Sequence, residues 1–126
     1  ECGGFLYLGQ SLTDAEGQSW PMAGVLPGEA KDAGRLVRFG YAALSAESDS
    51  MLFRAGESFP IHEFHHWDST ANGTAFTACK SAKMQWECGF ATENFYAGFP
   101  HFYWAGTPLS GRFVAAAECY IKGQQK

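Results

Sequence analysis

The chain has 126 residues, 46% of them hydrophobic and 17% charged, and its formal net charge at pH 7 is −4. This composition is ordinary for a soluble globular fold, and the length suffices for one domain, or part of one, with a hydrophobic core. The acidic balance gives no electrostatic basis for binding nucleic acid, and no run of about 18 apolar residues is present to span a membrane. We therefore expect neither nucleic acid nor a membrane as a partner.

The first part of the chain predicts a short helix followed by a broken loop. The apolar run after the first glycines favours a helix over about residues 3–9. Residues 20–28 contain two prolines and two glycines, which interrupt any long regular element.

Residues 37–100 predict a series of short strands, because segments rich in β-forming residues alternate with turn residues. The Asn72-Gly73 pair is typical of a hairpin turn between two of these strands. The expected strands span residues 37–44, 50–54, 59–66, 74–80, 85–91 and 94–99.

The last part of the chain has the signature of a helix. Thr107 suits the N-cap, Pro108 the first helical position, and Gly123 the residue after the last turn. The apolar residues that recur on one face are Phe113, Ala116, Ala117 and Tyr120. Short strands with a helix at each end favour an α/β fold, and we expect strands upstream of this chain to complete its sheet.

A cysteine near the start of the chain is a candidate nucleophile. Cys2 follows Glu1 and precedes two glycines, which suit a sharp strand-to-helix turn because no Cβ obstructs the reversal. The N–H groups of the following helix would stabilise the thiolate. For Cys2 taken alone, a small buried residue at a helix start remains the alternative. The strand that should lead into the turn is not in this sequence, so we expect the chain to be a C-terminal piece of a longer protein.

The remaining cysteines do not form a recognisable framework. Cys79, Cys88 and Cys119 show neither a CxxC motif nor zinc-ribbon spacing. We therefore expect reduced thiols and a cytoplasmic protein.

Three of the four histidines lie close together in residues 59–68. On a strand, Glu63 and His65 would share one face, whereas His62 and His66 would share the other. Glu63 could then fix the tautomer of His65. The cluster by itself fits a structural polar network, a metal site or a catalytic site equally well. One alternative is a metal-binding β-barrel of the cupin kind, whose ligands would come from this cluster and His101.

The fourth histidine, His101, lies between the last expected strand and the last helix. A half-buried structural histidine is the plain interpretation. A cysteine on a sharp turn and a histidine on a late loop are nevertheless similar to the catalytic pair of class I glutamine amidotransferases.

The wider sequence resembles the cobyrinic acid a,c-diamide synthase family in five motifs that occur in the same order along the chain. They are a Glu-Cys-Gly-Gly elbow with its apolar helix, a Pro-Met-x-Gly-x-Leu-Pro-Gly loop, an Arg-Leu-x-x-x-Gly-Tyr stretch, a His-Glu-Phe-His strand, and a Gly-x-x-His block before proline. The matching residues are 1–9, 21–28, Arg35, Leu36, Gly40, Tyr41, 62–65, Gly98, His101 and Pro108.

The resemblance implies a role for each of these site residues. Cys2 would be the nucleophile and His101 the proton-transfer group, while the N–H of Gly3 would stabilise the oxyanion, with His65 at the substrate. A second oxyanion donor would come from a loop before Glu1, so we expect the chain alone to be inactive.

The chain also departs from the family pattern. Ile61 replaces the glycine before the His-Glu-Phe-His motif, and His66-Trp67 replaces Tyr-Ser after it. Tyr103 stands where amidotransferases with a full triad have a glutamate, so another group must orient His101. Glu63 is one candidate.

For the whole enzyme, the resemblance implies amidation of the a and c carboxylates of cobyrinic acid, with glutamine as the ammonia donor. ATP and Mg²⁺ would bind to an upstream domain, and we expect no cofactor or metal on this chain. A related tetrapyrrole, either hydrogenobyrinic acid or a metallo-sirohydrochlorin, is the alternative substrate, and a catalytically silent homologue is the alternative in function. An unpaired sheet edge makes a homodimer possible.

Overall fold

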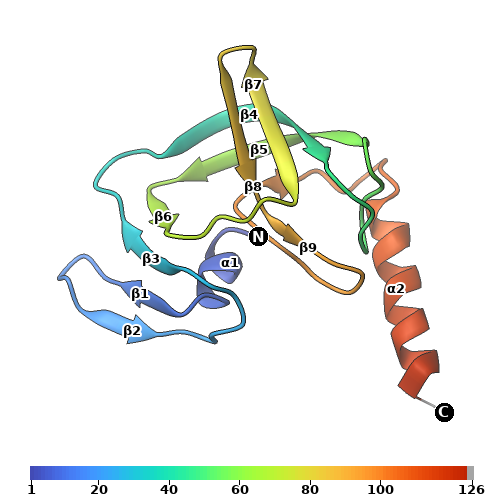
Figure 1. Cartoon of the computed structure of the whole chain (residues 1–126), viewed down its shortest axis with the longest axis horizontal. Helices are drawn as coiled ribbons and strands as arrows, with labels where there is room; N and C mark the ends of the chain where they lie inside the picture. Colours follow the sequence, from blue (N-terminus) through green and yellow to red (C-terminus); the bar gives the residue numbers. More distant parts are fainter. Residues whose placement is uncertain (125–126) are drawn as a thin grey trace.

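The computed structural model describes residues 1–124 and shows a mixed α/β fold with three sheets and two helices in that range (Figure 1). The five-stranded sheet has the order β11-β5-β4-β7-β8, the four-stranded sheet β2-β1-β3-β6, and the two-stranded sheet β10-β9. The helices are α1 (Gly3–Tyr7) and α2 (Leu109–Gln124). Residues 125 and 126 of the expected domain lie outside the described residues.

The five-stranded sheet is built around two long antiparallel strands. Its strands are β4 (Arg38–Ala46), β5 (Ser58–His65), β7 (Phe76–Ser81), β8 (Met84–Cys88) and β11 (His101–Phe102). Side chains of β5 alternate between the two faces, so that Ile61, Glu63 and His65 are buried. The face on which these residues lie also covers a core that includes Leu44, Phe53 and Phe76.

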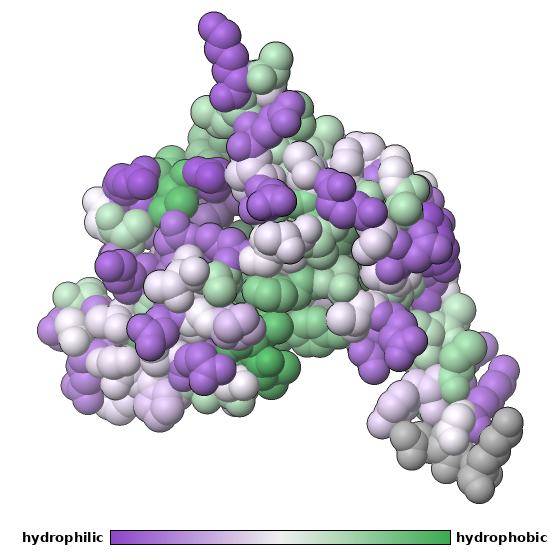
Figure 2. Space-filling model, in the orientation of Figure 1, coloured by the Kyte–Doolittle hydropathy of each residue, from purple (hydrophilic) through white to green (hydrophobic). Residues whose placement is uncertain are grey.

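The smaller sheets connect α1 to the rest of the molecule. The strands are β1 (Ser11–Thr13), β2 (Ser19–Pro21), β3 (Glu29–Asp32), β6 (Trp67–Ser69), β9 (Phe90–Ala91) and β10 (Tyr96–Ala97). A second core lies between α1 and these strands, and its buried members include Phe5, Leu6, Leu26, Ala30 and Phe99. Figure 2 shows hydrophobic residues gathered near the centre of the visible face, between the four-stranded sheet and α2.

The C-terminal helix begins as the sequence predicts. The N–H of Leu109 donates to Thr107 Oγ1 over 3.4 Å, as expected for an N-cap. Arg112 ties the helix to the body through two hydrogen bonds to the Glu57 carboxylate and one to the Leu52 carbonyl. Beyond this anchor α2 runs away from the sheets (Figure 1), and Phe113 and Tyr120 of its apolar face are 50% and 65% exposed.

Four expectations about local structure are wrong. Residues 50–54 form a turn and not a strand. Ser50 and Arg54 hydrogen-bond within this loop, and the side chain of Phe53 is buried in the core. Asn72-Gly73 does not close a hairpin, since the strands on either side both pair with β4. The helix continues past Gly123, and residues 10–36 contain three strands instead of an irregular loop.

The five-stranded sheet is open, with β11 and β8 at its edges, so residues 1–124 do not form the closed barrel that the cupin alternative requires. In the same part of the chain, no helix is long and apolar enough to cross a membrane.

Candidate active site

The backbone of Cys2 has an unusual conformation. Its φ of 50° and ψ of −113° make it the one non-glycine residue with positive φ among residues 1–124. A non-glycine residue held in such a region stores strain, which clusters at functional sites. The Cys2 N–H donates to the carbonyl oxygen of Gly98 over 2.9 Å, and the Cys2 carbonyl accepts from Leu6 over 3.1 Å. The turn predicted from the two glycines is therefore present.

Gly3 leaves open space beside the thiol. A Cβ built on Gly3 would meet no heavy atom within 4 Å. Within residues 1–124, no acceptor receives the N–H of Gly3. An N–H in this position is available to a developing negative charge next to Cys2.

His101 lies on the short edge strand β11, opposite His62 of β5. Its Nδ1 is 3.6 Å from Oε2 of Glu1, and the other carboxylate oxygen of Glu1 accepts a hydrogen bond from the Phe102 N–H over 3.4 Å. The Tyr96 hydroxyl donates to the carbonyl of Pro100 over 3.0 Å and so anchors the approach to β11. Burial, followed by the charge of Glu1, raises the pKa of Tyr96 well above its ordinary value, which keeps this donor protonated.

These contacts bring the first two residues of the chain against the segment 98–102. Glu1 contacts the strand of His101, and the next residue, Cys2, is bonded to Gly98 at the start of the same segment. No hydrogen bond joins the Cys2 thiol to the imidazole within residues 1–124, although both side chains belong to segments that are bonded to each other. The side chain of Cys2 is half-buried and that of His101 is 44% exposed, so both are open to a ligand.

Glu63 and His65 form a buried pair next to this site. Nε2 of His65 is 3.0 Å from the Glu63 carboxylate, whose other oxygen accepts a hydrogen bond from the Trp86 indole over 3.3 Å. Nδ1 of His65 is 2.7 Å from the Trp67 carbonyl, and its ring stacks on Phe99 at 3.7 Å between centroids. The expected pairing of Glu63 with His65 is confirmed.

The geometry of this pair differs from the two roles expected for it. Both Glu63 oxygens are engaged by His65 and Trp86, and the carboxylate beside His101 is that of Glu1. Glu63 is therefore not placed to orient His101. His65 lines the cavity beside Cys2, but Trp67 and Glu63 already engage both of its ring nitrogens. The ring can therefore pack against a substrate but has no free N–H to donate to the oxyanion.

The cavity next to the thiol has a volume of about 450 Å³, within the range of sites for small molecules. Apart from the thiol and two histidines, its walls are glycine and apolar side chains. They are Cys2, Gly3, Leu6, Leu12, Phe64, His65, His66, Trp67 and Phe99. Such a site can hold a small polar group against the sulfur.

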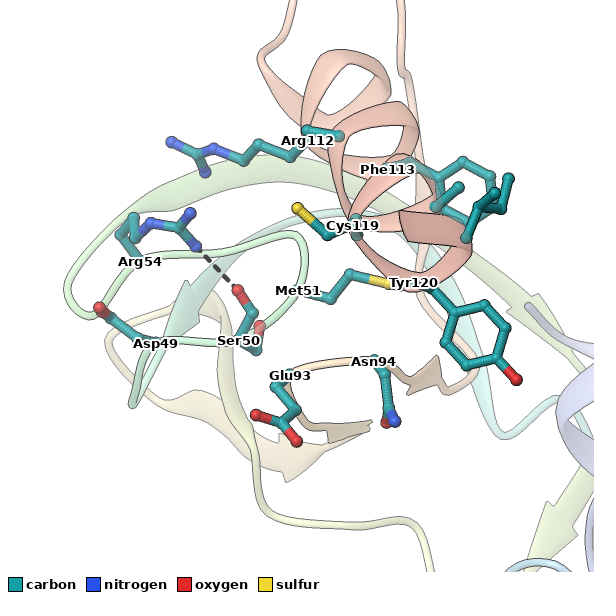
Figure 3. Close-up of a pocket in the computed structure, with 14 residues that line it drawn as sticks. Asp49, Ser50, Met51, Arg54, Glu93, Asn94, Arg112, Phe113, Cys119 and Tyr120 are labelled. Atoms are coloured by element: carbon teal, nitrogen blue, oxygen red, sulfur yellow. Dashed lines mark hydrogen bonds between the residues drawn. The ribbon is translucent and has the colours of Figure 1, made fainter. Parts of the chain in front are cut away.

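A larger hollow, of about 1010 Å³, lies between α2 and the loop 49–54 (Figure 3), and Cys2 is not among its lining residues. Figure 3 shows Met51, Phe113 and Tyr120 around it, with the acidic and basic side chains at its edge. Its one thiol, Cys119, has no histidine among the lining residues, so we place the chemistry in the smaller cavity.

Metal binding finds no support in this arrangement. In the part of the chain that the structure describes, no three His, Cys, Asp or Glu side chains gather closely enough to hold an ion. His62 and His66 do not share the buried face of Glu63 and His65, so the histidine cluster does not converge.

A model of the CobB/CobQ-like glutamine amidotransferase domain matches residues 1–108, most of the chain. The chain belongs to this family. The cobyrinate a,c-diamide synthase of Salmonella typhimurium is 36% identical to it over an alignment of 123 residues, which covers 93% of this chain and 27% of that protein. The resemblance found in the sequence motifs is thus confirmed.

Two further relatives of this CobB/CobQ-like domain carry the same name. The cobyrinate a,c-diamide synthase of Caldanaerobacter subterraneus subsp. tengcongensis is 36% identical over 104 residues, 80% of this chain and 23% of that protein. That of Picrophilus torridus is 31% identical over 121 residues, 95% of this chain and 25% of that protein. The chain therefore spans about a quarter of the length of these relatives.

Sequence reasoning about this CobB/CobQ-like domain missed three contributors to the site. Trp86 and Phe99 hold the buried pair, and Glu1 faces His101. No local signal marks the two aromatic residues, because they act through partners far along the chain. Glu1 did carry a signal, since an acidic residue directly before a candidate nucleophile sits on the same turn.

Proposed function

We propose that this chain is the glutaminase part of an enzyme that amidates the a and c carboxylates of cobyrinate, using glutamine as the ammonia donor. The observation that carries the proposal is the strained Cys2 turn bonded to the segment of His101, beside a cavity for a small molecule. Membership of the glutamine amidotransferase family and the names of the relatives support it.

The first chemical step forms a thioester. His101 takes the proton of the Cys2 thiol, and the sulfur attacks the side-chain amide carbon of glutamine. The carbonyl oxygen becomes an oxyanion, toward which the N–H of Gly3 would donate. As the tetrahedral intermediate collapses, the C–N bond breaks and ammonia leaves with the proton from His101.

The second step restores the enzyme. His101 takes a proton from a water molecule, whose oxygen attacks the thioester carbon. The C–S bond breaks, glutamate is released, and the sulfur regains the proton that His101 carries. The half-exposed imidazole of His101 suits a group that must receive and return protons.

The rest of the activity belongs to the part of the protein outside this chain. We propose that the fold is the C-terminal portion of a class I glutamine amidotransferase-like domain, spanning residues 1–126. We also propose that ATP and Mg²⁺ bind, and that the carboxylates are activated, in a domain upstream of this chain. The second oxyanion donor is assigned there too, so we propose that the 126 residues alone hydrolyse no glutamine.

A glutamine-analogue electrophile tests the glutaminase assignment. In the complete protein in which this sequence occurs, we expect the reagent to label Cys2 and excess glutamine to prevent labelling, as peptide mapping would show. Cys2→Ser should abolish the label, whereas Cys119→Ser, which changes an exposed thiol on α2, should not alter it. Labelling of another cysteine, or no protection by glutamine, would contradict the proposal.

A further inference from the structure

We infer that Glu1 is the positioning residue for His101, a role that rests on the glutaminase proposed above. The chain has Tyr103 where a full amidotransferase triad would carry a glutamate, so the residue that orients the imidazole must come from another place. The structure puts a different carboxylate beside the ring, on the residue directly before the nucleophile.

The carboxylate of Glu1 contacts the strand of His101 at two points. Oε2 lies 3.6 Å from Nδ1 of His101, and Oε1 accepts the hydrogen bond from the Phe102 N–H. The backbone of Glu1 is fixed as well, because its carbonyl accepts a hydrogen bond from Gly4 over 3.1 Å. The main chain of Phe102, the residue after His101, holds one carboxylate oxygen of Glu1, and the other oxygen faces the imidazole of His101.

No other carboxylate within residues 1–124 reaches His101 at ion-pair distance. The titratable neighbours across the sheet are His62, its partner on β5, and Tyr41, the partner of His62 on β4. Cys2 and Tyr103 follow Glu1 and Phe102 along the chain. Glu1 is the one acidic group in this set.

This contact favours one nitrogen of His101 as the base. The 3.6 Å between Nδ1 and the Glu1 carboxylate is an ion-pair contact and is longer than a hydrogen bond, but a negative charge on this side of the ring favours the tautomer with the proton on Nδ1. The lone pair then lies on Nε2, which is free to take the thiol proton. When the ring becomes an imidazolium, the negative charge of Glu1 stabilises it. Because Glu1 and Cys2 are consecutive, one turn holds both the nucleophile and the group that orients its base.

A purely structural function for Glu1, as the hydrogen-bond acceptor that holds the Phe102 N–H, makes different predictions. Loss of this hydrogen bond would loosen β11, lower stability and disturb substrate binding along with turnover. Loss of the positioning group would lower turnover of glutamine, leave its KM nearly unchanged and shift the tautomer of His101.

The experiment compares Glu1→Ala, Glu1→Gln and Glu1→Asp in the complete protein in which this sequence occurs, with Glu118→Gln as the matched control. Glu118 lies on α2, is 63% exposed and pairs loosely with Lys122, so its loss of charge should have no effect. The measurements are kcat and KM for glutamine hydrolysis, turnover with ammonium as the nitrogen donor, and the ¹⁵N NMR signals of His101 at alkaline pH.

We expect Glu1→Ala to lower kcat by about 10- to 100-fold, part of the 10²–10⁴-fold that positioned acid–base groups contribute. KM and ammonium-dependent turnover should stay within about twofold, and the His101 proton should shift from Nδ1 toward Nε2. Glu1→Gln keeps an acceptor without charge and should be intermediate, while Glu1→Asp should retain the tautomer and recover part of the rate.

An unchanged kcat or an unchanged tautomer in Glu1→Ala would overturn the inference, as would an equal loss with both nitrogen donors. Failure of the glutaminase proposal looks different, because the unsubstituted protein would then show no Cys2-dependent hydrolysis of glutamine.

Discussion

The N–H of Cys2 donates a hydrogen bond to the carbonyl oxygen of Gly98 over 2.9 Å. This bond links the first turn of the chain to the segment that leads into His101, near the opposite end of the sequence. Cys2 also has the positive φ, so the strained backbone and this bond lie at the same residue. The strained turn and the histidine strand therefore behave as one unit, and a change at Gly98 should disturb the chemistry at Cys2.

Gly98→Ala tests this coupling. A Cβ at Gly98 would lie 3.2 Å from both the Gly89 Cα and the Pro100 ring, neither of which can move freely. We expect a loss of about 1–3 kcal/mol in the free energy of unfolding, typical of overpacking, together with a lower rate of glutamine hydrolysis. Urea denaturation and a glutaminase assay would measure the two effects.

The matched control for this substitution is Gly111→Ala on α2. Nothing lies within 4 Å of a Cβ at Gly111, and alanine is favoured over glycine inside a helix by about 0.5–1 kcal/mol. Gly111→Ala should therefore stabilise the protein without altering hydrolysis. Equal behaviour of the two variants would refute the coupling of Gly98 to the active turn.

The buried pair beside the site should contribute to stability. Glu63 and His65 are 3% and 7% exposed, and His65→Phe would leave the Glu63 carboxylate with Trp86 as its one remaining partner. We expect a loss of about 3–5 kcal/mol in unfolding free energy, as when one member of a buried pair is removed. His62→Phe on the other face of β5, where Phe39 and Tyr41 already pack around the ring, should cost less than about 1 kcal/mol. A similar loss for both variants would show that the pair is not special.

The contribution of the Glu57–Arg112 pair, which attaches α2, to stability should be lost at acid pH. The bidentate hydrogen bond from Arg112 lowers the pKa of Glu57 from 4.5 to about 2. A carboxylate with a depressed pKa in the folded state stabilises the protein above about pH 4.5, and this contribution is lost as the pH falls toward 2. Both side chains are partly exposed, so we expect about 1 kcal/mol.

Glu57→Gln is the variant that checks this contribution. It should be less stable than the unsubstituted protein at pH 7, and the difference should shrink between pH 4.5 and 2, followed by thermal unfolding. A difference that stays constant over this range would contradict the ion-pair account.

How far the sequence alone leads is clearest from individual residues. The alternation of residues 59–66 placed Glu63 with His65, and the two glycines after Cys2 predicted its turn, because both patterns are local. The four-stranded sheet was not predicted from the sequence. Its strands β1, β3 and β6 are only three or four residues long, and each is stabilised by partners elsewhere in the chain. Residues 50–54 have the composition of a strand, but they form a turn from which the side chain of Phe53 packs into the core.

The contact between Glu1 and His101 shows the same limit at the site itself. Motif spacing indicated both segments but gave no distance between them, so the nearby Glu63 was the natural candidate for orienting His101. The first residue of the chain lies next to the ring through tertiary contacts, because the Cys2 N–H bonds to Gly98 and the Glu1 carboxylate accepts from Phe102. Partners so far apart in sequence cannot be read from local pattern.

The thiols should differ in reactivity according to their burial. Burial raises the pKa of Cys88 to about 12, whereas Cys119 is exposed on α2. At pH 7.5 we expect an alkylating reagent to modify Cys119 in the native protein and to leave Cys88 intact until denaturant is added. Mass spectrometry of digested samples would locate the adducts, and rapid modification of Cys88 in the native state would be inconsistent with its position in the core.

The central claim is that Cys2 releases ammonia from glutamine and takes no part in activating the acceptor carboxylate. The most direct measurement is the amidation of cobyrinate by the Cys2→Ala variant of the complete protein, with glutamine and with ammonium as alternative nitrogen donors. We predict that glutamine-dependent amidation is lost while ammonium-dependent amidation continues at close to the unsubstituted rate. Equal loss with both donors would contradict the claim and make Cys2 a structural residue.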